Sequence, residues 1–534
     1  MAKKKITKKK ATKVKRKPTA VRKRVTKKTS SVASKKAKTK VDPARAAFAG
    51  LTIRDCKRAA KSKFHIDTLH DEQIKAMRAL LRGNDTIAVL PTGFGKSLIY
   101  QALGCIVEQP VITISPLIAL MRDQELALIR ANVNVIRIDS SLGKRARADA
   151  IDTLKAGGQL FVLTTPESLQ SKDVRAALKK RPPALITIDE AHCISEWGHD
   201  FRPAYLGLGT IRKQLGNPAL LALTATATIQ VQSDISDRLQ MQTPVKIVAP
   251  PYRANLRFDV RKVPGSIKLS VAGKLIRKLR RPGIIYCSTT KAVDEIYGAL
   301  RKAKIPATRY HGKMAKNDRE RQQKEFFRRR TRKVMVATSA FGMGIDKPNI
   351  RYVMHYQVPG SIEQYVQEAG RAGRDGRPAN CILLFDEADL DIQQKLITKS
   401  HVNLRQLHSI GDALCAWANA KEPVSVDDLA LSAAVQKTSC RALCHRLEEA
   451  GLIETNDDRK LEVKVSGKKL RAAVGELGER FQIVQRGDIK RLNLMADYAR
   501  SSTCRSAYLN TCFDDTQAID CGVCDRCKSR SRAS

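Results

Sequence analysis

The feature that most constrains the fold is a glycine-rich turn between an apolar run and a helical pattern. Residues 86–90 are mostly apolar, residues 91–97 read PTGFGKS, and an apolar helical stretch follows. Glycines let backbone N–H groups approach phosphate oxygens, and the start of a helix adds its positive end. The turn therefore predicts a phosphate-binding loop, although Leu90 stands where the strict pattern has its first glycine. The expected nucleotide-binding residues in it are Thr92, Gly93, Gly95, Lys96 and Ser97.

Two of these residues have defined chemical roles. We expect the Lys96 ammonium to meet the β- and γ-phosphates and the Ser97 hydroxyl to bind Mg²⁺. The apolar run at 185–189, about 90 residues further on, ends in Asp189 and Glu190 of a DEAH sequence. Asp189 is positioned to hold Mg²⁺, and Glu190 to polarise an attacking water.

Short apolar runs alternate with helical stretches from about residue 48 to residue 399. One series lies at 86–90, 111–115, 135–138, 160–164, 185–189 and 220–223, and a second at 283–287, 333–338, 352–355 and 381–385. Continuous apolar strands separated by helices predict parallel sheets that are covered on both faces. We therefore expect two α/β units joined near 250–265, with ligands at the carboxyl ends of the strands.

The second unit contains two arginines that could complete the phosphate chemistry. Residues 367–376 read QEAGRAGRDG, and Arg371 and Arg374 are three positions apart, so they can share one face of a helical turn. Across a cleft from the phosphate-binding loop, they could stabilise charge on the transferring phosphoryl group. The alternative is a solvated basic turn.

The charge of the chain predicts a polyanionic partner. The chain has 534 residues, 99 Lys and Arg, 52 Asp and Glu, and a formal net charge of +47. Residues 1–45 hold 20 of these basic residues and one acid, Asp42, which predicts a disordered basic arm. This arm could bind phosphates without sequence preference, or serve as a solubilising or targeting tail. No apolar run approaches the length of a membrane span or of a secretory signal.

The alternation of apolar strands with helices ends after about residue 399. Helices are expected at 404–420, 426–431 and 438–450, followed by a hairpin at 452–465, which is the order of a winged helix. Arg441, His445 and Arg446 could make 438–450 a DNA-contacting helix, or this region could be a structural spacer. The predicted domains are 1–45, 46–250, 251–400, 401–470 and 471–534.

Cysteines near the C-terminus have the spacing of a metal site. They follow the pattern C-x16-C-x2-C-x2-C, and four thiolates can close a tetrahedral zinc site. An iron–sulfur or redox centre would also use four cysteines. The expected ligands are Cys504, Cys521, Cys524 and Cys527.

Taken together, these motifs resemble superfamily 2 helicases, and most closely the RecQ family. Further runs carry the resemblance: SPLIALMRDQ at 115–124, TTPE at 164–167, LTATA at 223–227, YHG at 310–312 and ATSAFGMGIDKP at 337–348. The stretch CISEWGHDFRP at 193–203 resembles the aromatic-rich loop with which this family senses single-stranded DNA. The DNA-contacting residues that it implies are Trp197, His199, Phe201 and Arg202.

The resemblance also implies an adenine site and a zinc module. Gln73 would read the adenine edge and Asp346 would contribute to nucleotide binding. Ile66 and His70 depart from the family's aromatic residue and arginine, which predicts weaker adenine binding. Zinc is the metal that the family favours.

The implied fold is two tandem RecA-like parallel-sheet domains, then a winged-helix-like segment and a helical zinc-binding module with four cysteine ligands. The implied activity is an ATP-dependent 3′→5′ DNA helicase that uses Mg²⁺, in recombination, repair or replication. Expected partners are single-stranded and duplex DNA, and a single-strand-binding protein or other repair proteins, with no membrane. The alternatives are an RNA helicase and a non-enzymatic architectural DNA-binding protein. The expected location is a bacterial cytoplasm, at the nucleoid, with the nucleus as the alternative.

Overall fold

The computed structural model describes residues 46–195, 201–250, 253–342, 347–420, 422–456, 458, 460–513 and 520–533. The basic arm at 1–45 thus lies outside the described residues, as do Trp197, His199 and Asp346. In these ranges no helix is both long enough and apolar enough to span a membrane.

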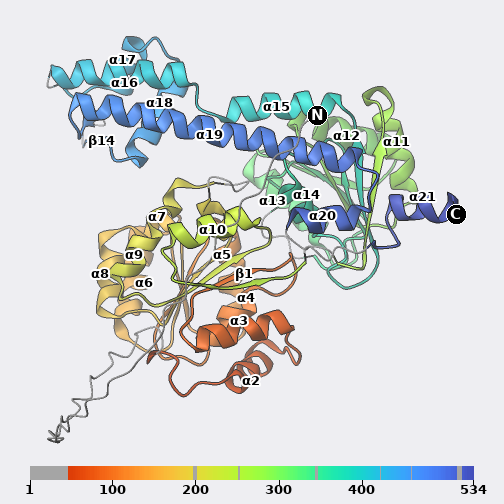
Figure 1. Ribbon diagram of the computed structural model, residues 1–534, viewed down its shortest axis with the longest axis horizontal. Helices are drawn as coiled ribbons and strands as arrows, with labels where there is room; N and C mark the ends of the chain where they lie inside the picture. Colours follow the sequence, from red (N-terminus) through yellow and green to blue (C-terminus); the bar gives the residue numbers. More distant parts are fainter. Residues whose placement is uncertain are drawn as a thin grey trace, which may run out of the picture. The chain divides into compact units, whose positions relative to one another are not determined.

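The first α/β unit is built on a seven-stranded parallel sheet, shown in red to yellow in Figure 1. Its strand order is β3-β4-β2-β5-β6-β1-β7, and β1 pairs with β6 and β7. The strands are β1 (Thr86–Val89), β2 (Val111–Ile114), β3 (Val135–Ile138), β4 (Phe161–Thr164), β5 (Leu185–Ile188), β6 (Ala219–Thr224) and β7 (Val245–Val248). The central strands are buried along their whole length, as their continuous apolar sequences require.

Helices cover both faces of this sheet, and a separate hydrophobic core lies against each face. They are α2 (Ile53–Phe64), α3 (Asp71–Leu81), α4 (Ser97–Gly104), α5 (Ile118–Arg130), α6 (Lys144–Ala156), α7 (Pro166–Leu169), α8 (Lys172–Lys180), α9 (Leu208–Gln214) and α10 (Ile229–Arg238), with 3-10 turns η1 (Ala191–Ile194) and η2 (Pro203–Tyr205).

The second α/β unit has a six-stranded parallel sheet with the order β10-β11-β9-β12-β13-β8. The strands are β8 (Leu256–Lys262), β9 (Gly283–Tyr286), β10 (Ala307–Tyr310), β11 (Val334–Ala337), β12 (Tyr352–His355) and β13 (Ala379–Phe385). The helices are α11 (Gly265–Lys278), α12 (Thr290–Lys302), α13 (Lys316–Phe327) and α14 (Ile362–Ala369). The prediction of two parallel α/β units is therefore confirmed.

Three strands of these sheets lack the apolar run from which the others were predicted. They are β7, β8 and β10, and each lies at an edge of its sheet. An edge strand has one solvated side, so polar residues interrupt it, as in the sequences VKIV and LRFDVRK. A search for continuous apolar runs misses strands of this kind.

The C-terminal region is helical and ends at the cysteines. It contains α15 (Ala388–Ser400), α16 (Leu404–Asn419), α17 (Val426–Ser432), α18 (Lys437–Glu449), β14 (Ile453–Thr455), β15 (Leu461–Val463), α19 (Gly467–Arg500), α20 (Arg505–Cys512) and α21 (Asp525–Ala533). The antiparallel β14–β15 hairpin follows α16, α17 and α18, and these elements share one hydrophobic core. This is the helix–helix–helix–hairpin order of a winged helix.

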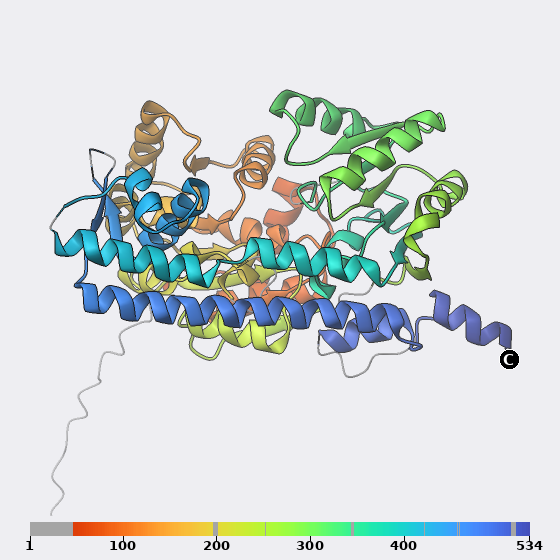
Figure 2. The same ribbon diagram turned by 90° about the horizontal axis from the view of Figure 1, so that it is seen from above.

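One helix connects this segment with the cysteine-containing end. Helix α19 is 34 residues long, and α15 and α16 lie along it in both views (Figures 1 and 2). It begins at Gly467, so the domain boundary predicted at 470 falls inside a continuous helix. The winged-helix-like segment is therefore inserted between two helices, α15 and α19, that pack on each other.

Candidate nucleotide and metal sites

The phosphate-binding loop joins the end of β1 to the start of α4 at Ser97. Gly93 and Gly95 have φ angles of 83° and 76°, a backbone region that glycine adopts without strain. A Cβ on Gly95 would also lie 2.9 Å from the Gln73 amide nitrogen. Leu90, at the place of the family's first glycine, is fully buried in the core beneath the loop. The chain therefore keeps both glycines that the turn requires, although Leu90 replaces the first glycine of the strict pattern.

Lys96 turns back onto the loop that carries it. Its Nζ donates a hydrogen bond to the Leu90 carbonyl over 3.0 Å. Burial lowers the pKa of Lys96, while the negative charges of Glu190 and Asp189 oppose this effect. A half-buried lysine near two carboxylates is therefore available at the mouth of the loop, where a phosphate chain would replace the carbonyl contact.

The carboxylates follow the buried strand β5, as the sequence predicted. Burial, and then the charge of Glu190, raise the pKa of Asp189 to about 6, against the opposing effect of Lys96. Gln124, in the 115–124 run, lies with its Nε2 3.4 Å from the Asp189 carboxylate. Glu190 has φ 50° and ψ 47°, a left-handed conformation that costs a non-glycine residue roughly 1–3 kcal/mol and that clusters at active sites.

His192 connects this pair to a neighbouring strand. A hydrogen bond of 2.9 Å joins its Nδ1 to the Thr224 hydroxyl, at the end of β6. The same nitrogen is 3.4 Å from the Glu190 carboxylate. The DEAH sequence and the LTATA run, recognised separately in the sequence, thus meet through one buried imidazole.

The turn that carries Arg371 and Arg374 faces the phosphate-binding loop. A Cβ placed on Gly93 would lie 3.3 Å from Cγ of Arg374, and one placed on Gly370 would lie 3.3 Å from Cβ of Thr92. Arg371 is buried, and its Nη2 lies 3.2 Å from a Cβ placed on Gly342. The structure therefore places the turn and its Arg374 side chain beside the phosphate loop, about 280 residues away in sequence, while Arg371 lies against Gly342 of its own unit.

Sequence reasoning missed two residues that hold this turn. Arg253 Nη2 donates to the carbonyls of Gly370 and Ala372, each over 2.6 Å, and Asn255 Nδ2 donates to the carbonyl of Gly373 over 2.7 Å. Both residues lie in the segment between β7 and β8 that joins the two units. They belong to no recognised run, so no signal in the single sequence identifies them.

The residues expected near adenine make contacts with the phosphate-binding loop instead. The Gln73 Nε2 donates to the carbonyls of Phe94 and Gly95, at 3.1 and 2.9 Å, and its side chain is buried. The rings of His70 and Phe94 have centroids 4.3 Å apart. Ile66 is 36% exposed. Gln73 thus supports the phosphate loop in this structure, and a role at adenine would need these contacts to change.

The described part of the aromatic-rich loop lies against the 115–124 run. Arg202 donates through Nη1 to the Pro116 carbonyl over 2.9 Å, and Phe201 is half-buried. The other two expected DNA-contacting residues, Trp197 and His199, lie outside the described residues.

The four cysteines form one compact cluster. Their Sγ atoms all lie within 4.8 Å of one another, with 3.9 Å from Cys504 to Cys524 and 3.5 Å from Cys524 to Cys527. Four thiolates around one zinc ion, with Zn–S bonds of about 2.3 Å, would be about 3.8 Å apart. The cluster of Cys504, Cys521, Cys524 and Cys527 therefore fits zinc.

A buried ion pair fixes this cluster to the second sheet. Arg505 is fully buried, and its Nε is 3.0 Å from the Asp525 carboxylate, which adjoins Cys524. Its guanidinium also lies 5.4 Å from the ring of Tyr498 on α19. Residues of α19 and α20 share a hydrophobic core with β8, β12 and β13. The cysteine cluster is thus continuous with the unit that carries the arginine turn.

Comparisons with known protein families match three parts of the chain. Residues 70–235 match the DEAD/DEAH box helicase family, residues 268–376 match the helicase conserved C-terminal domain, and residues 468–528 match the RecQ zinc-binding family. The last match begins at the start of α19, which agrees with that helix being part of the zinc module.

Two curated relatives align with about two thirds of this chain. The probable ATP-dependent DNA helicase RecS of Bacillus subtilis is 38% identical over 69% of this chain and 74% of its own length. The ATP-dependent DNA helicase RecQ of the same organism is 41% identical over 64% of this chain and 58% of its own length.

Two solved structures resemble the fold at low identity. The Mycobacterium smegmatis helicase Lhr, bound to single-stranded DNA and AMP-PNP, is 17% identical with a TM-score of 0.50, covering 83% of this chain and 74% of its own. The helicase MrfA bound to DNA is 19% identical with a TM-score of 0.52, covering 78% of this chain and 61% of its own. At these identities, the likeness concerns the fold alone.

Proposed function

Since this chain belongs to the RecQ family of helicases, we propose that it is an ATP-dependent DNA helicase that moves 3′→5′ on single-stranded DNA. The observation that carries the proposal is the meeting of Lys96, Asp189 and Arg374 at one phosphate-binding loop. These residues come from both α/β units, as hydrolysis coupled to movement between the units requires. The 38% identity with a RecS helicase supports DNA as the substrate.

ATP would bind on the loop at 91–97, with Lys96 leaving the Leu90 carbonyl to contact the β- and γ-phosphates. Ser97 and Asp189 would hold Mg²⁺, which when bound neutralises charge on the phosphate oxygens. Glu190 would then orient the attacking water and accept its proton. His192, held by Thr224, lies 3.4 Å from the Glu190 carboxylate.

Arg371 and Arg374 would stabilise the charge that develops on the γ-phosphoryl group. Arg253 and Asn255, in the segment joining the two units, hold the turn through hydrogen bonds. A change in the angle between the units would therefore move the arginines. This gives a physical route from hydrolysis to opening and closing of the cleft. Single-stranded DNA would be held by Phe201 and Arg202, together with Trp197 and His199, through stacking and phosphate contacts.

The two alternatives predict different substrates or no reaction. An RNA helicase would share the motor residues, whereas an architectural DNA-binding protein would have no use for a carboxylate pair near a half-buried lysine. The relatives come from bacteria and eukaryotes, so the bacterial nucleoid remains the proposed location and the nucleus its alternative.

The test compares wild type with Lys96→Ala in DNA- and RNA-stimulated ATPase assays and in unwinding of a duplex with a 3′ overhang. We expect DNA to stimulate hydrolysis, 3′ overhangs to be opened in preference to 5′ overhangs, and the variant to lose both activities. Lys57→Ala, at an exposed position on α2, is the matched control and should keep both. Equal unwinding by Lys96→Ala would exclude the mechanism, and stimulation by RNA alone would favour the RNA helicase.

A further inference from the structure

The second α/β unit has a charged surface at the edge of its sheet opposite the YHG and ATSAFGMGIDKP runs. Strands β10, β11 and β9 are neighbours, and they begin in register, since Ala307 pairs with Val334 and Val334 with Gly283. The three loops that precede these strands therefore meet at one level, and Val334 N donates to the Pro306 carbonyl across two of them. The YHG run and the 337–342 part of the ATSAFGMGIDKP run follow the opposite ends of β10 and β11.

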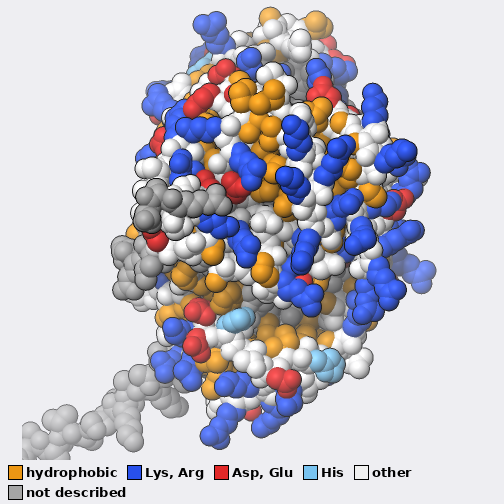
Figure 3. Space-filling view, turned by 90° about the vertical axis from the view of Figure 1, so that its right-hand side faces the viewer, with side chains coloured by type: hydrophobic (Ala, Val, Ile, Leu, Met, Phe, Trp, Pro, Cys, Tyr) orange, Lys and Arg blue, Asp and Glu red, His pale blue; other side chains and the backbone are white. Residues whose placement is uncertain are grey.

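Eight of the fourteen residues in these three loops are basic, and none is acidic. The loops span 279–282, 303–306 and 328–333, and we call their basic residues the basic edge: Arg280, Arg281, Lys304, Arg328, Arg329, Arg330, Arg332 and Lys333. Six of them are exposed, while Arg281 and Lys333 are half-buried. Within the part of the chain that the structure describes, Lys333 is the member of this set that pairs with a carboxylate, that of Glu325. Figure 3 views the side that carries α11, on which Lys and Arg side chains outnumber Asp and Glu side chains.

Compensation of helix dipoles does not account for this charge. Cations in the last turn of a helix are stabilising, and Lys278, Arg301 and Lys302 fill that role at the ends of α11 and α12. The basic edge lies beyond those last turns. Five cations within six residues, at 328–333, repel one another at separations below the Debye length of about 8 Å. Folding alone therefore gives no reason to gather them.

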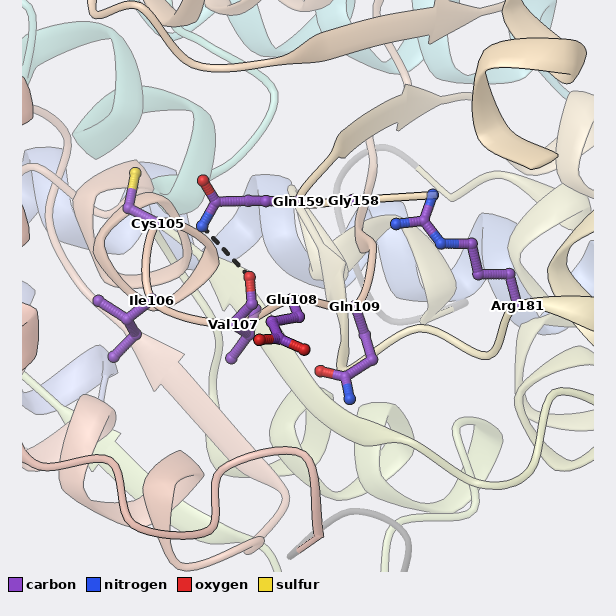
Figure 4. A pocket seen from close by; sticks show the side chains of 8 residues that line it. All are labelled: Cys105, Ile106, Val107, Glu108, Gln109, Gly158, Gln159 and Arg181. Atoms are coloured by element: carbon purple, nitrogen blue, oxygen red, sulfur yellow. Dashed lines mark hydrogen bonds between the residues drawn. The ribbon is translucent and has the colours of Figure 1, made fainter. Parts of the chain in front are cut away.

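The first unit offers an internal comparison. Its sheet has the same strand order, and its loops before β2, β3 and β4 correspond to the loops before β9, β10 and β11. They lie at 105–110, 131–134 and 157–160, which also total fourteen residues. They contain one acid, Glu108, and no base. Residues of the first and third of these loops, together with Arg181, line an open hollow of about 610 Å³, in which the Gln159 amide donates to the Val107 carbonyl (Figure 4). The corresponding loops thus carry almost no charge in one unit and are strongly basic in the other.

We propose that the basic edge binds duplex DNA at a site separate from the single-strand path of the motor. The three strands span about 10 Å, the width over which a duplex presents about six phosphates. Single-stranded sites generally add aromatic stacking, and the fourteen residues include no aromatic side chain. A surface that contacts phosphates but cannot stack on bases favours duplex DNA over single-stranded DNA. The chain would then hold one duplex while its motor engages a single strand of the same or another molecule.

The proposal is tested by site-specific cross-linking in the full-length chain without ATP. The photoreactive residue p-benzoylphenylalanine replaces Arg330 in one variant and Glu108, in the corresponding loops of the first unit, in the control. Each protein is saturated with unlabelled oligo-dT and then mixed with a labelled blunt duplex. We expect a cross-link to the duplex from position 330 that oligo-dT does not remove, and none from position 108.

Three results would overturn the proposal: no cross-link from position 330, equal cross-links from both positions, or loss of the cross-link with oligo-dT. Capture of an RNA duplex at tenfold lower concentration than a DNA duplex would reject DNA as the ligand. Because the assay needs no hydrolysis, its outcome is independent of the helicase activity proposed above.

A second measurement uses the variant with Arg329, Arg330 and Arg332 all changed to Gln. Each phosphate contact contributes about 0.9 to the slope of log affinity against log salt, so the slope for duplex binding should fall by about 2.7. Single-strand-stimulated ATPase should be unchanged. A salt slope equal to that of wild type would show that these arginines do not contact the duplex.

Discussion

Replacement of Arg253 by alanine tests whether the segment joining the two units positions Arg371 and Arg374, for which we propose a catalytic role. The guanidinium donates to the carbonyls of Gly370 and Ala372 over 2.6 Å, on either side of Arg371. A hydrogen bond from a charged donor contributes about 1.5–3 kcal/mol, so the variant removes roughly 3–6 kcal/mol that holds the turn. A displacement of about 1 Å at a reacting group can cost about 100-fold in rate.

The assay is DNA-stimulated ATP hydrolysis, with kcat and KM measured separately. We expect kcat of Arg253→Ala to fall about 100-fold while the KM for ATP changes less than about threefold, because the phosphate-binding loop makes no contact with Arg253 among the described hydrogen bonds. Asn255→Asp should act in the same direction, since its side chain would face two carbonyl oxygens without a donor. Arg261→Ala, on the exposed end of β8, is the matched control.

Thermal unfolding separates positioning from stability. If Arg253→Ala keeps the wild-type melting temperature and the wild-type kcat, the turn does not depend on this residue and the reasoning is wrong. A parallel loss of kcat and rise of KM would instead indicate general damage to the nucleotide site.

Four further outcomes are expected. Removing residues 1–45 should flatten the salt dependence of DNA binding and leave maximal DNA-stimulated ATPase largely intact, and a steeper salt slope would contradict this. His70→Arg should lower the KM for ATP about fivefold if a stacked guanidinium adds about 1 kcal/mol, and equal KM values would show that the departure at His70 has no effect. Cys524→Ser should reduce bound zinc from one per chain to none by metal analysis and lower the melting temperature, whereas retained zinc would exclude this ligand set. Arg441→Gln with Arg446→Gln should weaken fork binding if α18 contacts DNA, and unchanged binding would make the inserted segment a spacer.

The groups of the predicted sites could be recognised from the sequence where their chemistry is local. The phosphate-binding loop needs glycines at two positive φ angles and a lysine directly after them, and the structure has all three in seven consecutive residues. The zinc cluster is similar, because three of its cysteines lie within seven residues of each other. The same pattern predicted Cys504 as the fourth ligand, and the fold brings its Sγ to the other three from the residue before α20.

Strands β7, β8 and β10 and the contacts of Arg253 were not predicted because they depend on neighbours that are distant in sequence. Strand β8 is recognisable only through its pairing with β13, and Arg253 only through carbonyls about 117 residues away. In the same way, the sequence shows arginine and lysine in three separate loops, and only the common register of β9, β10 and β11 makes them one surface.

The sequence by itself determined the chemistry of this protein: a phosphate loop, a carboxylate pair, two arginines and four thiolates, each written in a short run. The tertiary structure decided how these runs act on one another. It placed Arg374 against Gly93, inserted the winged-helix-like segment between α15 and α19, and tied the arginine turn to the joining segment through Arg253. The physical reason is that motifs encode the functional groups a reaction needs, whereas distances between groups come from sheet register and helix packing, to which residues across the whole chain contribute.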